Sequence, residues 1–312
     1  MIRDPGTSDA PHAPGASGMA GVAGGRLVLL PTPLGNLGDL VPRAAELLAT
    51  ADVVACEDTR HTAKLLALIG VRARRLIAVH EHNEAAMAVS IVERVRLGET
   101  VALVSDAGMP GISDPGERVV RAVAEAGQTV SVVPGGSAGI SALVVSGLPT
   151  ARWVFEGFLP RRGADRARRL DALASEERTV VLYEAPHRLV ATLADLVRAC
   201  GDTRRMVIVR ELTKLHEEVW RGTLGSALTR VGEPRGEHVI VLDGCPAVPA
   251  ADDAAIAAAL ADELALDGDR RAAVSAVTVA LSVPRRRVYD VVMGMRDQAT
   301  FSDVPAPGKP AE

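Results

Sequence analysis

The chain has 312 residues, of which 48% are apolar, and its formal net charge is −4. This length and composition predict a globular protein of about two domains. No apolar run approaches the roughly 20 residues that span a bilayer, and the amino terminus lacks the apolar core of a signal peptide, so we expect a cytoplasmic protein. The negative charge argues against a protein that coats nucleic acid by bulk attraction.

Both ends of the chain have a composition typical of disorder. Residues 1–24 are rich in Gly, Pro, Ala and Ser, residues 299–312 are similar, and we expect both to be disordered. Cys56, Cys200 and Cys245 are too few and too far apart for a disulfide framework or a thiolate zinc site. His80 and His82 lack a third ligand, so we expect no metal.

From Gly25 to about Ser146, short apolar strands alternate with amphipathic helices. We expect strands at 26–30, 53–56, 76–80, 101–104 and 129–133, with helices at 39–49, 59–69, 83–97, 115–126 and 137–146. In this reading Asp39 caps the first helix. This alternation predicts βαβ units and a mostly parallel sheet. Gly147-Leu148-Pro149 breaks the pattern, and we place a domain junction there.

A second α/β unit follows the break. We expect its strands at 153–158, 179–183, 205–209, 218–222 and 238–242, and its helices at 163–174, 187–199 and 223–231. The closeness of the last two strands predicts a mixed sheet. A linker at 246–249 leads to helices at 252–265, 270–281 and 284–295, which form a helix-turn-helix-like unit or a small bundle. The predicted domains are thus 25–148, 149–246 and a helical segment at 250–298.

The run from Val101 to Gly116 is the most informative stretch of the sequence. A buried strand ends at Ser105-Asp106, and a loop rich in Gly and Pro leads to a helix near Asp114. A carboxylate at the carboxyl end of a parallel strand, followed by glycines, is typical of ligand sites in open α/β sheets. The alternative is that Asp106 and Asp114 only cap a turn and a helix.

Polar clusters follow other predicted strands in both units. They lie at 57–62, 80–84, 183–188, 210–214 and 235–238. Helix capping by Asp58 or Asn83 would not also need Arg60, His61 and His80. The clusters end strands in both α/β units, so we predict a polar cleft where the strand ends of the two units face each other. Only three residues are lysines, and we expect Lys64 and Lys214 to be kept for specific contacts.

Several ordered motifs resemble those of the tetrapyrrole-methylase superfamily, and more narrowly its branch that acts on ribosomal RNA. They lie at 32–39, 57–62, 105–110, 112–116, 156–160, 184–188 and 210–214, and the resemblance runs from about Arg26 to Gly244. Ser105-Asp106-Ala107 replaces the Gly-Asp-Pro common in the superfamily, as is typical of the RNA branch. Gly135-Gly136-Ser137 departs slightly from the usual Pro-Gly-x-Ser/Cys-Ala run.

The resemblance implies two tandem α/β domains with a cofactor cleft between them and a small C-terminal helical segment. It implies transfer of a methyl group from S-adenosylmethionine to the ribose 2′-hydroxyl of a cytidine in the decoding region of 16S rRNA, by a homodimer. An assembled small subunit is the expected partner, because the net charge gives little attraction for free RNA. The alternatives are methylation of a tetrapyrrole or a protein side chain, and a non-catalytic RNA-binding relative.

The resemblance also implies cofactor contacts at Leu34, Asp106, Gly108, Met109, Ser137, Ala138, Glu184, Leu212 and Gly236. From the polar clusters we predict a catalytic group made of Glu57, Arg60, His61 and His80. Asp58 and Lys64 are further candidates for a general base. We expect Arg60→Ala to abolish activity without unfolding the protein. RNA phosphates are predicted to contact Arg161, Arg162, Arg188, Arg285 and Arg286.

Overall fold

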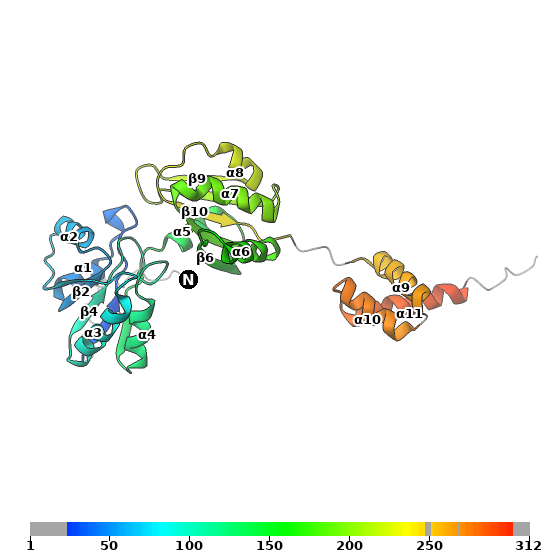
Figure 1. Ribbon diagram of the computed structural model, residues 1–312, viewed down its shortest axis with the longest axis horizontal. Helices are drawn as coiled ribbons and strands as arrows, with labels where there is room; N and C mark the ends of the chain where they lie inside the picture. Colours follow the sequence, from blue (N-terminus) through cyan, green and yellow to red (C-terminus); the bar gives the residue numbers. More distant parts are fainter. Residues whose placement is uncertain (1–23, 247–250, 268, 302–312) are drawn as a thin grey trace, which may run out of the picture. The chain divides into compact units, whose positions relative to one another are not determined.

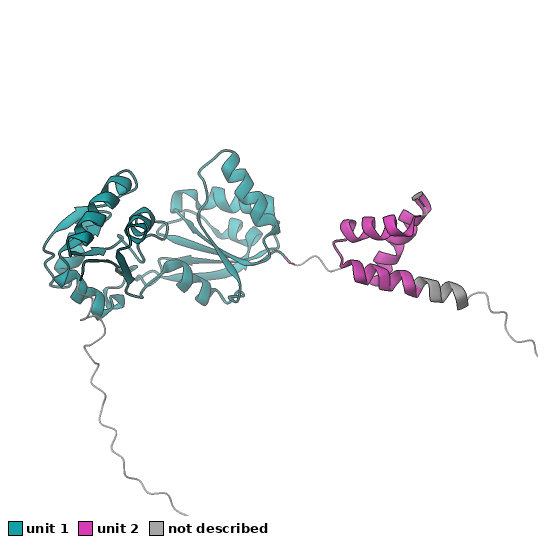
Figure 2. Ribbon diagram, turned by 90° about the horizontal axis from the view of Figure 1, so that it is seen from below, with its two compact units in different colours: residues 1–245 teal, residues 246–312 magenta. Residues whose placement is uncertain are grey.

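The computed structural model describes residues 24–246, 251–267 and 269–301 (Figure 1). Residue contacts divide the chain after Cys245 into two units (Figure 2). Residues 1–23 and 302–312 hold most of the predicted extension and tail, and they lie outside the described residues. In the described residues, no helix is long and apolar enough to cross a membrane.

The first unit begins with a five-stranded parallel sheet in the order β3-β2-β4-β1-β5. These strands form because short apolar runs can be buried on both faces of a parallel sheet. Apolar side chains of α1 and α2 pack on one face, and those of α3 and α4 pack on the other. The strands are β1 (Arg26–Leu29), β2 (Val53–Cys56), β3 (Leu76–Ala78), β4 (Thr100–Leu103) and β5 (Thr129–Val132), and the helices are α1 (Pro42–Thr50), α2 (Thr59–Leu68), α3 (Glu84–Arg96) and α4 (Glu117–Glu125).

Local chemistry explains where these helices begin. The Asp58 carboxylate caps α2 by accepting a hydrogen bond from the Arg60 amide at 2.8 Å. The expected cap of the first helix, Asp39, is wrong. Asp39 ends the short 3₁₀ helix η1 (Leu37–Asp39), and α1 begins at Pro42, whose missing N–H suits a first turn.

The second sheet is mixed, as the sequence predicts, with the strand order β6-β7-β10-β8-β9. Strands β6 and β7 are parallel, and the other neighbours are antiparallel. Helices α6, α7 and α8 cover one face of this sheet. The strands are β6 (Trp153–Phe158), β7 (Thr179–Glu184), β8 (Arg205–Arg210), β9 (Glu218–Thr223) and β10 (His238–Leu242), and the helices are α6 (Ala164–Ser175), α7 (Pro186–Cys200) and α8 (Leu224–Arg230).

Helix α5 (Ala138–Ser146) connects the two sheets. It follows β5 of the first sheet, but Ala142 and Leu143 pack against the uncovered face of the second sheet. Gly139 allows this close approach, since a Cβ there would lie 3.3 Å from the Phe155 ring and from the Tyr183 hydroxyl. The chain therefore passes from one sheet to the other just before α5.

The second unit consists of three helices with a core of their own, α9 (Asp253–Asp267), α10 (Arg270–Ala280) and α11 (Arg285–Phe301). Side chains from all three, including Ile256, Val274 and Val288, are buried together. The three helices confirm the predicted helical segment. A tight turn joins α10 to α11, and Ser282 takes a left-handed conformation in it, with φ of 50°.

Candidate active site

A cavity of about 330 Å³ lies where loops of the two sheets meet, and we call it the cleft cavity. The part of the cavity nearer the first sheet is lined by Leu34, Asp106, Ala107, Gly108, Met109, Ile112, Ser113, Asp114, Ser137 and Ala138. The part nearer the second sheet is lined by Phe158, Tyr183, Glu184, Ala185, Pro186, Glu237, His238 and Val239. The lining is apolar overall but includes carboxylates from both sides.

The parallel sheet brings the first group together. Leu34 follows β1, Asp106 and Gly108 follow β4, and Ser137 follows β5, so these residues come from the same edge. Backbone hydrogen bonds of 2.9 and 3.0 Å join Thr32 to Gly108 and hold two of these loops together. Gly108 has φ of +83°, and a Cβ there would lie 2.9 Å from a Leu34 methyl carbon, so the position requires glycine.

Carboxylates of the two loops that follow β2 and β4 face one another at this edge. Asp106 accepts a hydrogen bond from the Asp58 amide at 3.3 Å, and its other oxygen lies 3.9 Å from His61 Nδ1. Burial, with the nearby Glu57 charge, raises the pKa of Asp114 to about 7. Burial and the Asp106 charge likewise raise the pKa of Glu57. Asp114 can therefore gain or lose a proton near neutral pH.

The helix that follows this loop is anchored by a buried acid of α3. The Glu84 carboxylate is 6% exposed and accepts hydrogen bonds from the Gly116 and Arg118 amides, both at 2.9 Å. It thereby caps the amino end of α4. Glu84 has a structural role, although it belongs to one of the polar clusters after a strand.

The four predicted catalytic residues lie beside the cleft cavity rather than in its lining, as far as the described residues show. Glu57 and His61 reach the Asp106 carboxylate electrostatically. Arg60 is 87% exposed at its side chain and bonds back to the Asp58 carboxylate at 2.9 Å. The buried His80 Nδ1 has no hydrogen-bond partner among the described residues.

Two aromatic rings from the second sheet complete the lining. The Tyr183 hydroxyl accepts a hydrogen bond from the Gly139 amide at 2.9 Å, and burial raises the Tyr183 pKa. The Phe158 ring lies 5.7 Å from the Tyr183 ring and is 50% exposed. An exposed aromatic ring at the cavity offers a stacking surface for a flat ligand.

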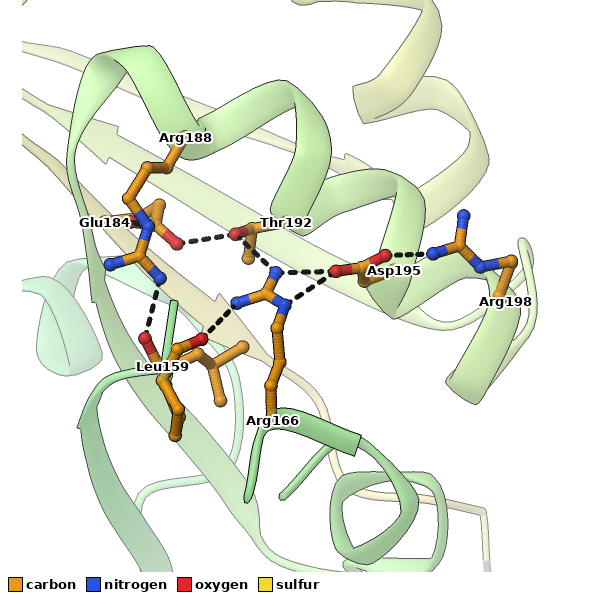
Figure 3. Close-up of polar contacts among 8 residues, drawn as sticks. Leu159, Arg166, Glu184, Arg188, Thr192, Asp195 and Arg198 are labelled. Atoms are coloured by element: carbon orange, nitrogen blue, oxygen red, sulfur yellow. Dashed lines mark hydrogen bonds and ion pairs between the residues drawn. The ribbon is translucent and has the colours of Figure 1, made fainter. Parts of the chain in front are cut away.

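The Glu184 carboxylate belongs to a closed network behind the cavity (Figure 3). It accepts hydrogen bonds from the Thr192 hydroxyl at 2.6 Å and the Ala185 amide at 2.9 Å, and it lies 3.2 Å from Arg188 Nε. Arg188 also donates to the Leu159 carbonyl at 2.6 Å. The guanidinium that we expected on RNA phosphate is thus held inside the protein.

A second arginine closes the network. Arg166 pairs with Asp195 at 2.7 Å, donates to the Thr192 hydroxyl at 3.0 Å and donates to the Pro160 carbonyl at 2.9 Å (Figure 3). These bonds tie α6, α7 and the end of β6 together. The loop that follows Phe158 is therefore fixed from behind.

Two predicted cofactor contacts fall outside the cavity lining. Leu212 is partly buried and packs with the apolar cluster that includes α5. Gly236 has φ of +81°, and a Cβ there would lie 2.5 Å from the Glu211 side chain. Gly236 therefore gives the chain room beside Glu211, one residue before the lining begins at Glu237.

Lys214 makes the kind of specific contact that its rarity predicts. Its Nζ lies 2.9 Å from carboxylate oxygens of both Glu211 and Glu237. Its stem crosses Gly35, where a Cβ would lie 2.2 Å from Lys214 Cγ. Lys214 thus connects a loop of the second sheet to a loop of the first. Lys64 is exposed on α2.

The other predicted RNA contacts are accessible. Arg161 and Arg162 are exposed in the loop after β6, and no hydrogen bond or ion pair within the described chain engages them. Arg285 and Arg286 are exposed at the start of α11, with the Arg285 guanidinium 5.7 Å from the Tyr289 ring centre. The searched, described residues hold no group of three or more His, Cys, Asp and Glu suited to a metal ion.

Sequence reasoning did not assign several lining residues to the site. Tyr183 and His238 lie in polar clusters that the sequence singled out, at 183–188 and 235–238, and Phe158 lies in the motif at 156–160, but none of the three was given a role. The signal was available for Asp114, which the sequence places eight residues after Asp106 in the same loop.

The model of the tetrapyrrole (corrin/porphyrin) methylases matches residues 26–228. The chain belongs to the tetrapyrrole methylase family. Within it, the chain is similar to proteins named ribosomal RNA small subunit methyltransferase I. The protein of that name from Synechocystis sp. is 50% identical over 222 residues, which cover 70% of this chain and 79% of the relative.

A second relative extends the similarity towards the carboxyl end. The ribosomal RNA small subunit methyltransferase I of Mycobacterium tuberculosis is 44% identical over 278 residues, covering 88% of this chain and 97% of its own. That share of the chain is larger than the first unit, so the similarity continues into the three-helix unit.

Solved structures show the fold. A diphthine synthase has a TM-score of 0.57 at 16% identity, covering 70% of this chain and 90% of its own. A cobalt precorrin-4 methyltransferase has a TM-score of 0.51 at 18% identity, covering 70% and 94%. Two expectations are therefore confirmed, namely membership of the family and an α/β fold with two sheets.

Proposed function

We propose that this protein transfers a methyl group from S-adenosylmethionine to the 2′-hydroxyl of a cytidine ribose in the decoding region of 16S rRNA. The observation that carries the proposal is the 50% identity to a ribosomal RNA small subunit methyltransferase I over 70% of the chain. The chemistry of the cleft cavity agrees with it, because carboxylates and apolar side chains line the same space.

The cavity residues fit the proposed cofactor. Leu34, Met109 and Ala138 provide an apolar surface for an adenine ring, and Gly108 lets the backbone come close. The Asp106 carboxylate lines this space and would accept a hydrogen bond from a ribose hydroxyl or attract a positive sulfur. When bound, S-adenosylmethionine supplies an electrophilic methyl group on a positively charged sulfur.

The chain's own residues must hold the ribose hydroxyl in line and accept its proton. Alignment alone contributes on the order of 7–11 kcal/mol to such a displacement. We assign the proton to Asp114, because a group with a pKa of about 7 is well matched to base catalysis at neutral pH. Burial, with the Glu57 charge, holds that pKa high, and the exposed Arg60 and His61 would contact the RNA.

The Phe158 ring and the two free arginines after it form an RNA-facing edge. A cytidine turned out of its stack can lie against the half-exposed ring, while Arg161 and Arg162 contact neighbouring phosphates. Arg188 is not included in this edge, because its guanidinium is bound to Glu184 and Leu159. An RNA substrate inside the small subunit implies that the protein acts in the cytoplasm.

We extend the proposal to a homodimer. Val132 on the edge strand β5 is 49% exposed, and Ile140 and Val144 on one face of α5 are 53% and 67% exposed. Exposed apolar side chains of this kind are typical of surfaces that a second protein covers. Sedimentation should give a dimer that Ile140→Asp with Val144→Asp converts to a monomer, and a monomeric parent protein would contradict this part.

The test of the activity uses labelled S-adenosylmethionine and small subunits from cells that lack this methylation. We expect label on one cytidine ribose, which is located by mapping the phosphodiester bond that resists alkaline cleavage. We also expect calorimetry to show binding of the cofactor. Label in an extract without RNA would point to a small-molecule or protein substrate. A folded protein that binds subunits but takes up no cofactor would instead be a non-catalytic RNA binder.

A further inference from the structure

A second cavity, of about 360 Å³, lies on the face of the second sheet that α7 and α8 cover, and we call it the outer cavity. Side chains of β8 and β9, the first residue of β10 and the loop after α8 line it. The proposed methyl transfer gives none of these side chains a role. His238 is the residue that also lines the cleft cavity.

A polar row crosses the sheet at this point. Glu184, His238, Arg210 and Glu218 stand opposite one another on the successive strands β7, β10, β8 and β9. Cross-strand partners point to the same face of a sheet. The same face is otherwise apolar, with Leu182, Ile240 and Ile208 in its core. The row therefore interrupts a buried apolar surface between the two cavities.

Two groups in the middle of this row have unmet hydrogen-bonding capacity. His238 is 5% exposed, and its Nδ1 has no hydrogen-bond partner among the described residues. The buried Nε of Arg210 likewise has none there. An unpaired buried polar atom destabilises the fold, so each is expected to gain a partner when the protein works. Burial lowers the His238 pKa, which keeps the ring neutral and able to donate or accept.

The cavity also offers planar surfaces. The Trp220 ring lies over Gly222, where a Cβ would come within 2.5 Å of it. The Arg230 guanidinium lies 5.8 Å from the centre of the Trp220 ring. An indole and a guanidinium are among the groups on which proteins stack unpaired bases. The absence of a side chain at Gly222 thus leaves the space that the Trp220 ring occupies at the cavity.

The charges of the lining favour an anion by a small margin. Arg210, Arg230 and Arg235 face Glu218 and Glu233, which leaves one positive charge in excess. Arg230 lies 2.8 Å from Glu218 and Arg235 lies 3.8 Å from Glu233, whereas Arg210 is 3.9 Å from Glu218. Arg210 and Arg235 are thus both weakly paired, and Arg210, with its buried Nε that has no partner among the described residues, is the better placed to receive a phosphate.

We propose that the outer cavity binds a nucleotide, with its base against Trp220 and Arg230 and its phosphate at Arg210, and that this nucleotide belongs to the RNA segment carrying the methylated cytidine. The inference rests on the proposed function. His238 separates this site from the cleft cavity, so the two sites suit two nearby nucleotides of one strand. The outer cavity then selects the sequence or shape around the target.

Fluorescence tests the site directly, because Trp153 and Trp220 are the only tryptophans of the chain. In a Trp153→Phe protein, Trp220 reports alone. Titration with cytidine monophosphate, a short single-stranded RNA and small subunits should give saturable quenching. Arg210→Gln should weaken this binding at least tenfold, and the exposed Arg230→Gln should weaken it as well. Arg205→Gln, at the other end of β8 and paired with Asp243, is the matched control.

Kinetics separate this inference from the proposed function. Arg210→Gln should raise KM for small subunits at least tenfold, with kcat and the affinity for S-adenosylmethionine unchanged and the melting temperature retained. Quenching by the free nucleotide with an unchanged KM would identify an effector site and overturn the RNA assignment. No quenching and an unchanged KM would overturn the whole inference while methylation stands. Absence of cofactor uptake and methylation would remove the proposed function itself.

Discussion

The carboxyl edge of the first sheet and the corresponding edge of the second carry similar polar residues but use them differently. After β2 and β4, Glu57 and Asp106 face other acids, and no arginine or lysine ion pair with either is found in the described residues. After β7, the Glu184 carboxylate is enclosed by Thr192 and Arg188. A polar run after a strand in the sequence therefore predicts a cluster of charged side chains at that edge of the folded sheet. Their partners decide whether the cluster does chemistry or holds the fold.

The largest effect is expected at Arg60, on the first edge. Arg60→Ala should abolish methyl transfer, a loss of roughly a thousandfold, because its guanidinium is exposed and held in place by Asp58, where it can position the RNA. Cofactor affinity and melting temperature should remain unchanged, as measured by calorimetry and thermal unfolding. Arg43→Ala, an exposed arginine of α1, is the control. Near-normal turnover would remove Arg60 from the substrate side.

On the second edge, Glu184→Ala should act on stability first. Removing this buried carboxylate leaves Arg188 without its partner, which costs about 3 kcal/mol and lowers the melting temperature by roughly 10 °C. Glu177→Ala, an exposed acid on the same half, should change neither quantity. A stable Glu184→Ala protein with lost cofactor affinity would assign Glu184 to binding and erase the contrast between the edges.

The opposite result is expected for Asp106→Asn. Cofactor affinity should fall about 10- to 100-fold, the loss expected for one charge-assisted hydrogen bond, while the melting temperature stays within about 2 °C. Calorimetry and thermal unfolding measure the two quantities, and Asp171→Asn on the exposed side of α6 is the matched control. Unchanged affinity would mean that the aspartate only orders its loop.

The raised pKa of Asp114 predicts that stability depends on pH at the first edge. Its pKa of about 7 is above the value in an unfolded chain, so the folded state holds the proton more tightly. The stability gained this way is complete below about pH 4 and is lost as pH rises through 7. Asp114→Asn should remove this loss, worth about 2 kcal/mol at pH 8 after solvent screening.

The same variant should lower kcat and remove the rise in rate around pH 7, since an amide accepts no proton. Urea unfolding at pH 5 and pH 8, with a pH–rate profile, gives both readouts. Equal pH dependence in the parent protein and in Asp114→Asn would contradict the assignment of the base.

The smallest effect concerns the three-helix unit. Replacing Arg285 and Arg286 by Gln should weaken binding of small subunits several-fold and lower the slope of log affinity against log salt by about two, one for each phosphate contact. Unchanged affinity and slope would leave this unit without an RNA role. Equal activity on free RNA fragments and on subunits would further contradict the preference for an assembled subunit.

Most of the fold could be predicted because its elements are locally specified. Apolar runs such as Val53–Cys56 are readily assigned to a buried strand. The mixed sheet was predicted from the closeness of the strands at 218–222 and 238–242, but these two strands are not neighbours in the sheet. The antiparallel pair that follows directly along the chain is β8 and β9, because the seven residues between Arg210 and Glu218 are too few for a parallel crossover. The start of α1 was mistaken because Asp39 resembles a cap, while the rigid Pro42 sets the actual first turn.

The site was predictable where one edge of a parallel sheet collects it. Asp106, Gly108 and Ser137 meet because β4 and β5 run in the same direction beside β1. The partners of Glu184 and Arg188 were not predictable, since Thr192 and the Leu159 carbonyl approach them only through tertiary packing. Tyr183 and His238 lie in two of the predicted polar clusters but were given no role, because their contact with the cavity depends on which face of the second sheet they occupy.

The path of α5 has a consequence for dissecting this protein into pieces. A fragment that stops at the Gly147 break would carry α5 away from the sheet it covers and expose Ala142 and Leu143 to water. A fragment that stops after Val133 would leave that helix with its own partner strands. Separately expressed halves should therefore recombine when the chain is divided before Ser137, and aggregate when it is divided at the sequence break.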